Sequence, residues 1–272
     1  MRFLSFLCVM LAGLPALTSS GAERQHVKAS FLAEVKSAKP GASFDVGVLL
    51  RIDPQWHIYW ENPGESGSPT RVVIGAPVGV IVDAARYPLP ESFTQPGDIK
   101  GFGYEDEVML VARVTVPKDW PKGKTLELRA DASWLNCKDV CLPGKAKLEL
   151  SVPVGDAHEG DNTDVFTKWK ERLPSPPDAA PFKLEGIASE LKLSWSEEVK
   201  DVEVLPIPPD GVEVPTITVD QAGKITHIKP VLRRLGGEKK PDAALGLLVT
   251  YHDAGGQRRG VRLSIPLKKA GD

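Results

Sequence analysis

Two cysteines, Cys137 and Cys141, stand four residues apart in the segment WLNCKDVCLPG and are the side chains of this chain best suited to covalent chemistry. This separation lets their Cα atoms approach within the roughly 4.4–6.8 Å that a disulfide requires. As a stabilising cross-link the bond would contribute little, because closing a loop of about five residues is worth about 2 kcal/mol, against about 5 kcal/mol for a loop of about 100. The spacing therefore favours thiol chemistry over structural cross-linking.

The residues around the pair influence its reactivity, since only the thiolate form of a cysteine attacks another group. Lys138 favours the thiolate and Asp139 opposes it. The following Leu142-Pro143-Gly144 predicts a turn, which would keep Cys141 near a surface. The pair is not spaced as CxxC and no βαβ pattern surrounds it, so a thioredoxin fold is excluded.

The amino terminus has the order of a secretory signal peptide: Arg2, an apolar run over 3–17, then small residues up to Ala22. We expect residues 1–22 to be removed by cleavage after Ala22. The alternative is a membrane anchor, but the run is about 15 residues and a spanning helix needs about 20. Cleavage would remove Cys8 and leave one pair of thiols in an oxidising compartment, where a pair at short spacing is expected to cycle or to close on itself.

The composition limits the kind of protein and of partner. Of 272 residues about 250 would remain after cleavage, which is enough for one large or two ordinary domains. Removing Arg2 from 34 basic residues leaves 33 against 36 acidic ones, a net charge near −3 with both signs interspersed. Nothing in this pattern indicates nucleic-acid binding. No second apolar run is long enough to span a membrane, so we expect no span after signal cleavage.

The hydrophobic pattern predicts an all-β protein. Apolar and polar residues alternate with period two, and turns rich in Pro and Gly separate the segments, which is typical of antiparallel sandwiches. The alternating segments are 44–48, 71–74, 108–116, 125–129 and 147–152, and then 191–195, 202–205, 217–219, 245–251 and 261–267.

A change of composition after Gly155 predicts a domain boundary. We expect a signal-free first sandwich over 23–155, a linker over 156–181 and a second sandwich over 182–272. Within the linker, Thr163 could cap a short helix over 164–172, with Phe166 and Trp169 on one face. The alternative is a long loop within one large sandwich. The second sandwich carries no cluster of titratable groups, so a scaffold or docking role is expected for it.

Two further segments contain unusual residues. In a strand over 56–60, His57 and Tyr59 would lie on one face and Trp56, Ile58 and Trp60 on the other; ordinary core packing is the alternative. In the Gly-rich segment 97–107, glycines flank Phe102 and could let a loop place its ring over a neighbouring group as a lid. An ordinary hairpin connection explains the same pattern.

Taken together, WHIYWENPGESGSP, GFGYEDEV and WLNCKDVCLPG resemble, in that order, the amino-terminal domain of the thiol:disulfide interchange protein DsbD, and more closely its ScsB-type relatives. The resemblance covers about residues 25–155. It implies a periplasmic, immunoglobulin-like fold whose Cys137 and Cys141 act as a thiol-disulfide oxidoreductase. By similarity, Cys141 is the attacking thiol and Cys137 resolves the mixed disulfide. The implied cap contains Ile99, Phe102 and Tyr104, and the resemblance implies that His57 and Tyr59 line the pair. Lys138 is expected beside the pair because it directly follows Cys137.

The family's full-length members continue into a multi-helix membrane domain and a thioredoxin-like domain that supply electrons, and this sequence contains neither. The resemblance therefore implies thioredoxin-like or disulfide isomerase-type partners and a separate membrane electron donor, and it leaves the direction of transfer open. No cofactor and no metal ion are expected. Two alternatives remain: a protein that handles Cu(I) through its two thiolates, and a non-catalytic β-sandwich binding module whose disulfide shapes a loop.

Overall fold

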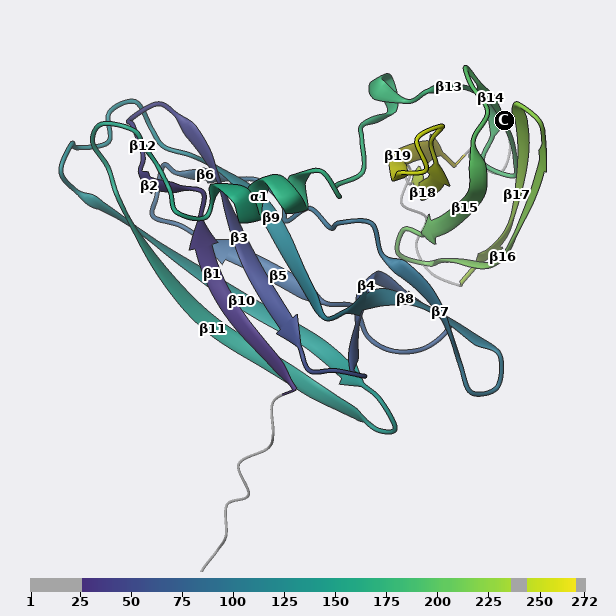
Figure 1. The fold of residues 1–272 in the computed structure, drawn as a ribbon, viewed down its shortest axis with the longest axis horizontal. Helices are drawn as coiled ribbons and strands as arrows, with labels where there is room; N and C mark the ends of the chain where they lie inside the picture. Colours follow the sequence, from purple (N-terminus) through teal and green to yellow (C-terminus); the bar gives the residue numbers. More distant parts are fainter. Residues whose placement is uncertain (1–25, 236–243, 268–272) are drawn as a thin grey trace, which may run out of the picture.

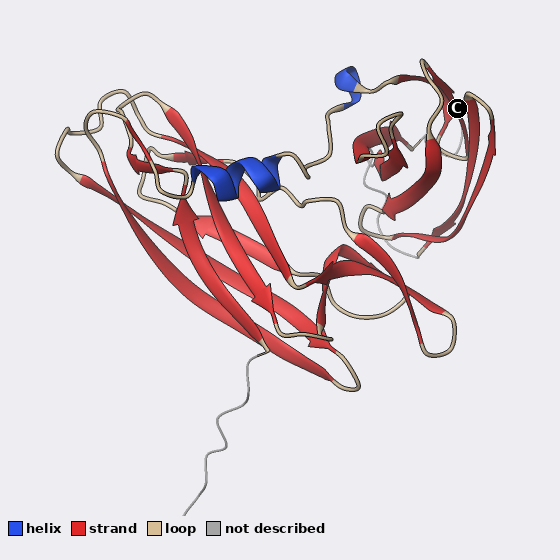
Figure 2. Ribbon diagram, in the orientation of Figure 1, coloured by secondary structure: helices blue, strands red, loops and turns tan. Residues whose placement is uncertain are grey.

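The computed structural model describes residues 26–235 and 244–267 and is built almost entirely of antiparallel strands (Figures 1 and 2). The predicted signal peptide, residues 1–22, lies outside the described residues. Within the described ranges no helix is long and apolar enough to cross a membrane. The all-β, immunoglobulin-like prediction is confirmed.

The first sandwich consists of two main sheets. One sheet has the order β1 (Val27–Ala33), β3 (Ser43–Ile52), β9 (Glu107–Thr115), β6 (Ile81–Val82). The other has the order β11 (Cys141–Pro153), β10 (Thr125–Cys137), β4 (His57–Gly64), β8 (Ile99–Glu105), β7 (Glu91–Gln95), and β5 (Arg71–Gly75) also pairs with β10. A small additional sheet joins β2 (Val35–Ser37) to β12 (His158–Glu159).

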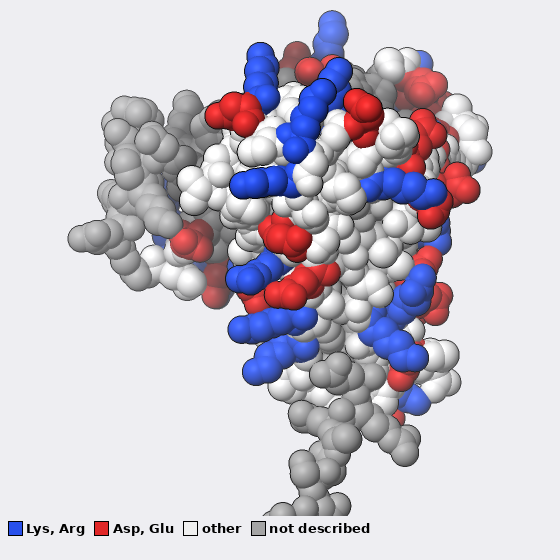
Figure 3. All heavy atoms as spheres, turned by 90° about the vertical axis from the view of Figure 1, so that its left-hand side faces the viewer, with Lys and Arg blue, Asp and Glu red and all other residues white. Residues whose placement is uncertain are grey.

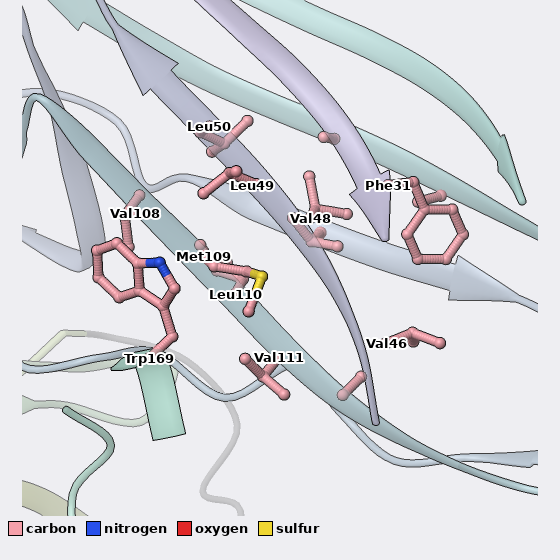
Figure 4. Close-up of a cluster of buried hydrophobic side chains, with 14 of the residues drawn as sticks. Phe31, Val46, Val48, Leu49, Leu50, Val108, Met109, Leu110, Val111 and Trp169 are labelled. Carbon is pink, nitrogen blue, oxygen red and sulfur yellow. The ribbon is translucent and has the colours of Figure 1, made fainter. Parts of the chain in front are cut away.

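The core of this sandwich explains why its strands differ in pattern. Strand β10 alternates from Thr125 to Trp134, because one face is buried and the other meets solvent. Strand β3 is buried from Phe44 to Leu50 without alternation, because helix α1 (Thr163–Lys170) belongs to the same hydrophobic cluster as β3 and β9. Figure 4 shows Trp169 of α1 beside Val108 of β9. Helix α1 is therefore part of the first core.

A buried carboxylate, Asp45 on β3, helps to hold the helix. Its oxygens accept bonds from Arg113 at 3.0 and 3.2 Å, and Lys170 Nζ of α1 lies 2.8 Å away. Burial by itself would raise the pKa of Asp45, but the hydrogen bonds and charges of Arg113 and Lys170 outweigh it and bring the pKa below its ordinary value. The carboxylate is thus ionised, and its cations are supplied by both β9 and α1.

The second sandwich has a separate core. One sheet has the order β13 (Phe182–Ile187), β14 (Glu190–Trp195), β17 (Ile225–Arg234), β16 (Val212–Ala222). The other has the order β15 (Lys200–Ile207), β18 (Ala244–His252), β19 (Arg258–Pro266). Between them Trp195 packs edge-on against Phe182 and Tyr251.

The segment 156–181, predicted as a linker with a short helix, divides between two environments. Its first part packs on the first sandwich through β12 and α1, and only 173–181, with the short helix η1 (Pro177–Ala179), crosses to the second. The predicted cap is wrong: the helix begins at Thr163 itself, whose hydroxyl donates to the Gly160 carbonyl outside the helix. The stretch that crosses between the sandwiches is short, because burial of Phe166 and Trp169 docks the helix on the core of the first sandwich.

The two sandwiches contact each other directly. The Ser175 amide donates to the Gly260 carbonyl at 2.8 Å and thereby adds the crossing segment to β19. Leu205 and Leu248 of the second sandwich are buried in the hydrophobic cluster of the first. On the face shown in Figure 3, basic and acidic side chains are interspersed, in keeping with the balanced composition.

Candidate functional site

The two cysteines form the last residue pair of the β10–β11 hairpin. Cys137 and Cys141 face each other in register, with Cα atoms 4.1 Å apart and an S–S bond of 2.02 Å. The three residues between them form the tip, where Val140 is 59% exposed. Cys137 is 1% exposed, whereas Cys141 is exposed to solvent. One cysteine therefore lies at the surface, while the other lies against the protein.

Strand β4 provides the wall on the Cys137 side. His57 pairs with Cys137 in the sheet, and the Tyr59 hydroxyl donates to Cys137 Sγ at 3.5 Å. The alternation predicted for this strand holds, because Ile58 and Trp60 point into the core. The structure thus brings His57 and Tyr59 to the buried sulfur.

Gln95 at the end of β7 lies in the same group, although sequence reasoning missed it. Its side-chain nitrogen Nε2 donates to the Tyr59 hydroxyl at 2.7 Å and lies 3.3 Å from His57 Nε2. Its Oε1 accepts from the Ser66 hydroxyl at 2.8 Å. A continuous chain of hydrogen bonds therefore runs from the loop after β4, through the β7 strand, to the sulfur.

His57 has an altered proton affinity in this group. Burial lowers its pKa, and the charge of Glu105, its neighbour across the β4–β8 pairing, opposes this only in part. The ring is therefore neutral near pH 7. A neutral imidazole has one nitrogen without hydrogen, so His57 Nε2 can accept from Gln95.

The cover over Tyr59 and His57 differs from the prediction. The aromatic ring comes from Phe93 on β7, whose centroid lies 4.5 Å from that of His57 and 6.0 Å from that of Tyr59. Gly101 on β8 leaves the space for it, since a Cβ there would lie 2.4 Å from Phe93 Cε2. Gly101 thus contributes to the site because it has no side chain and leaves room for the ring of Phe93.

The residues predicted as the cap lie elsewhere on the β7–β8 hairpin. Phe102 packs against Trp60 at 6.5 Å between centroids, and the buried Tyr104 hydroxyl donates to the Pro88 carbonyl. Both side chains point to the face of β8 opposite to Gly101, because successive residues of a strand alternate between its two faces. Ile99 stands opposite Gln95 next to the hairpin turn. The assignment of Phe102 and Tyr104 to the cap is therefore wrong.

Lys138 lies at the hairpin tip beside the pair. Its ammonium group is exposed and donates to the side chain of Gln55. Trp56, next along the chain, stacks on His26 at 3.8 Å. Among the residues that the structure describes, no three His, Cys, Asp or Glu side chains gather as a metal site would require.

The second sandwich contacts the base of the hairpin that covers the site. Arg258 of β19 donates to the Pro90 carbonyl at 2.8 Å and to the Glu91 carboxylate at 3.1 Å. Glu203 of β15 accepts a hydrogen bond from the Ser92 hydroxyl. Both contacts hold β7 just before Phe93. Figure 1 shows the β7–β8 hairpin projecting from the first sandwich, below the second sandwich in this view.

Comparison with solved structures finds a domain with a similar architecture. The N-terminal periplasmic domain of ScsB from Proteus mirabilis superposes with a TM-score of 0.62 at 18% identity, covering 90% of this chain and 95% of that one. The reduced N-terminal domain of DsbD from Neisseria meningitidis matches at 16% identity over 48% of this chain and 90% of its own, with a TM-score of 0.26. The first likeness establishes the fold.

Sequence comparison gives the family. No curated protein matches the chain significantly. Residues 26–153 match the family described as thiol:disulfide interchange protein DsbD, N-terminal. This range contains the whole β10–β11 hairpin and every residue of the site. The first sandwich of this chain is therefore a DsbD-type N-terminal domain.

Proposed function

We propose that the protein is a periplasmic thiol-disulfide interchange protein that acts through Cys137 and Cys141. The observation that carries the proposal is the unequal exposure of the two cysteine residues, because an exchange site needs one cysteine that a partner can approach and a second that resolves the product. The match of residues 26–153 to the DsbD N-terminal family supports it.

In the reduced protein, the Cys141 thiolate attacks one sulfur of a partner disulfide. A bond forms between Cys141 Sγ and that sulfur, the partner's S–S bond breaks, and its other sulfur leaves as a thiolate. The Cys137 thiolate then attacks Cys141 Sγ, which closes the internal disulfide and releases the second partner thiolate. Two electrons pass to the partner, and relative reduction potentials decide whether the sequence runs forward or in reverse.

The partners that fit this chemistry are thioredoxin-like or disulfide isomerase-type proteins, whose exposed redox pairs could approach the tip formed by residues 138–140. The electrons would be restored to the pair by a separate membrane donor. Tyr59 supports the reaction, because its hydroxyl donates toward Cys137, the sulfur that becomes a thiolate whenever the internal disulfide opens.

A fully buried pair with no movable cover could not exchange with a partner, and would leave the alternative of a non-catalytic module with a shape-determining disulfide. Exposure of Cys141 favours exchange over that alternative. The Tyr59 donor, placed at the less accessible sulfur, favours it as well, since a permanent cross-link has no use for a group that stabilises a thiolate.

Trapping of a mixed disulfide tests the proposal. The Cys137→Ser variant keeps the exposed thiol and lacks the resolving one, so it should accumulate a covalent adduct with an oxidised thioredoxin-fold protein as probe, visible on a non-reducing gel and abolished by dithiothreitol. Cys141→Ser is the matched control and should trap far less. If neither variant forms an adduct and the native disulfide resists strong reductants, the exchange function is refuted.

A further inference from the structure

The Gln95 side chain has one orientation that satisfies all its neighbours. Its Oε1 accepts from the Ser66 hydroxyl at 2.8 Å, and its amide nitrogen faces Tyr59 and His57. The reversed amide would still satisfy Ser66, whose hydroxyl can accept, but its oxygen would take the Tyr59 hydrogen and leave Cys137 Sγ, which can only accept, without a donor. The contact of Tyr59 with Cys137 therefore sets the direction of the chain of bonds, and the Ser66 hydroxyl fits it as a donor.

This orientation determines what Tyr59 does. Its oxygen accepts from Gln95 at 2.7 Å, and its own hydrogen is left for Cys137 Sγ. A disulfide sulfur carries no hydrogen, so the tyrosine is necessarily the donor in that contact. The ring cannot turn away on its other side, because Gly67 lies against it so closely that a Cβ there would be 2.4 Å from Tyr59 Cζ.

When a thiolate attacks Cys141 Sγ, the Cys137–Cys141 bond breaks and its electron pair remains on Cys137. A hydroxyl already directed at that sulfur stabilises the new negative charge through a charge-assisted hydrogen bond. A donor behind the hydroxyl strengthens this bond, because hydrogen bonds in a chain polarise one another. Gln95 is that donor.

We propose that Gln95 is a positioning residue for disulfide exchange, acting through the Tyr59 hydroxyl to stabilise the Cys137 thiolate. Gln95 lies on the hairpin that covers Tyr59 and His57, so the same hairpin both covers these side chains and supplies the donor that acts on the sulfur. Displacement of β7 by a partner would remove Phe93 and the donor together. The inference rests on the proposed exchange function and assigns to it a residue outside the cysteine hairpin.

The charged and titratable groups near this part of the site are few. His57 faces Gln95 from β4, Glu105 pairs with His57 from β8, and Lys138 follows Cys137 at the hairpin tip. Gln95 itself carries no charge. A change of Gln95 to an uncharged side chain therefore tests the hydrogen bond without altering the charge of the site.

The test is the pKa of the Cys137 thiol, measured from thiolate absorbance in a Cys141→Ser background. Gln95→Leu should raise this pKa and lower the thiolate fraction roughly 2- to 10-fold, the size of one hydrogen bond. Thr94→Ala, an exposed change on the same strand, should leave the pKa unaltered. Circular dichroism checks that each variant is folded.

A double-mutant cycle separates positioning from mere covering of the site. In a Tyr59→Phe background, Gln95→Leu should have no further effect on the Cys137 pKa, because the hydroxyl through which it acts is absent. An unchanged pKa in the single variant, or an equal rise with and without the Tyr59 hydroxyl, would overturn the proposal. No partner protein is involved, so this result is independent of the trapping experiment that tests the exchange function itself.

Discussion

Replacing Arg258 by alanine should expose Cys137 by loosening the β7–β8 hairpin. Arg258 joins the second sandwich to Pro90 and Glu91, directly before the part of β7 that contacts His57 and Tyr59. Its side chain is 23% exposed, but the Glu91 carboxylate is 73% exposed and its ion pair is largely screened by solvent. We therefore assign most of the effect to the bond with the Pro90 carbonyl.

The magnitude follows from these contacts. A hydrogen bond of this kind contributes about 0.5–1.5 kcal/mol and an exposed ion pair about 0.2–1 kcal/mol, so Arg258 stabilises the closed hairpin by about 1–2 kcal/mol. Since about 1.4 kcal/mol corresponds to a factor of ten, the open population should rise by roughly 5- to 30-fold. Cys137, which is 1% exposed in the closed state, should become accessible by the same factor.

The assay is the rate at which iodoacetamide alkylates Cys137 in a Cys141→Ser background. Arg258→Ala should accelerate alkylation. Added salt should raise the alkylation rate of the parent protein more than that of the variant, because salt screens only an ion pair that is present. Arg259→Ala is the matched control: this neighbour bonds Asp253 at 3.1 Å in the β18–β19 turn and does not reach the hairpin. Equal alkylation rates in all three proteins would refute the idea that the second sandwich holds the cover.

Three further predictions concern the framework of the site. Trp169→Ala should lower the free energy of unfolding by about 3–5 kcal/mol in urea titrations, since the indole is 2% exposed in the core; a loss below about 1 kcal/mol would contradict the docking of α1. Asp45→Asn should cost about 3–5 kcal/mol near pH 7. Because folding lowers the pKa of Asp45 from 3.8, its stabilisation is complete above that value and is lost as the pH falls through the lower folded-state pKa; a difference between parent and variant that stays constant down to pH ~2 would contradict this sign. Gly67→Ala should displace the Tyr59 ring and raise the Cys137 pKa, whereas Gly123→Ala, at a similar φ of +81° but with open space around it, should change only stability; equal Cys137 pKa values in the two variants would contradict the close packing of Tyr59.

Much of the site follows from local sequence rules. Side chains in a strand alternate between faces, so the sequence places His57 and Tyr59 together and keeps Trp60 away from them. Cysteines separated by three residues close naturally at the end of a hairpin. The turn predicted at Leu142-Pro143-Gly144 is wrong, because these residues pair with β10 as the start of β11 and the chain reverses at 138–140, between the cysteines. The same alternation with period two predicts the all-β fold.

The cover could not be found in this way, although a signal was present. The turn at Pro96-Gly97 marks a hairpin, and the segment before it, with Phe93 and Gln95 at alternate positions, has the same phase as Gly101 across the turn. Parity within a strand says only that Phe102 and Gly101 face opposite ways; it does not say which of the two faces meets the cysteines.

What the sequence alone determined is therefore the alternation of each strand, the pairing of the two thiols and the family of the first sandwich. Tertiary structure decided which strand lies beside which, and with it the choice of Phe93 and Gln95 as the cover, the docking of α1 and the contact of Arg258 with the hairpin. The reason is physical: the direction of a side chain depends on the backbone of its own strand, whereas its neighbours depend on register and packing between segments far apart in the chain.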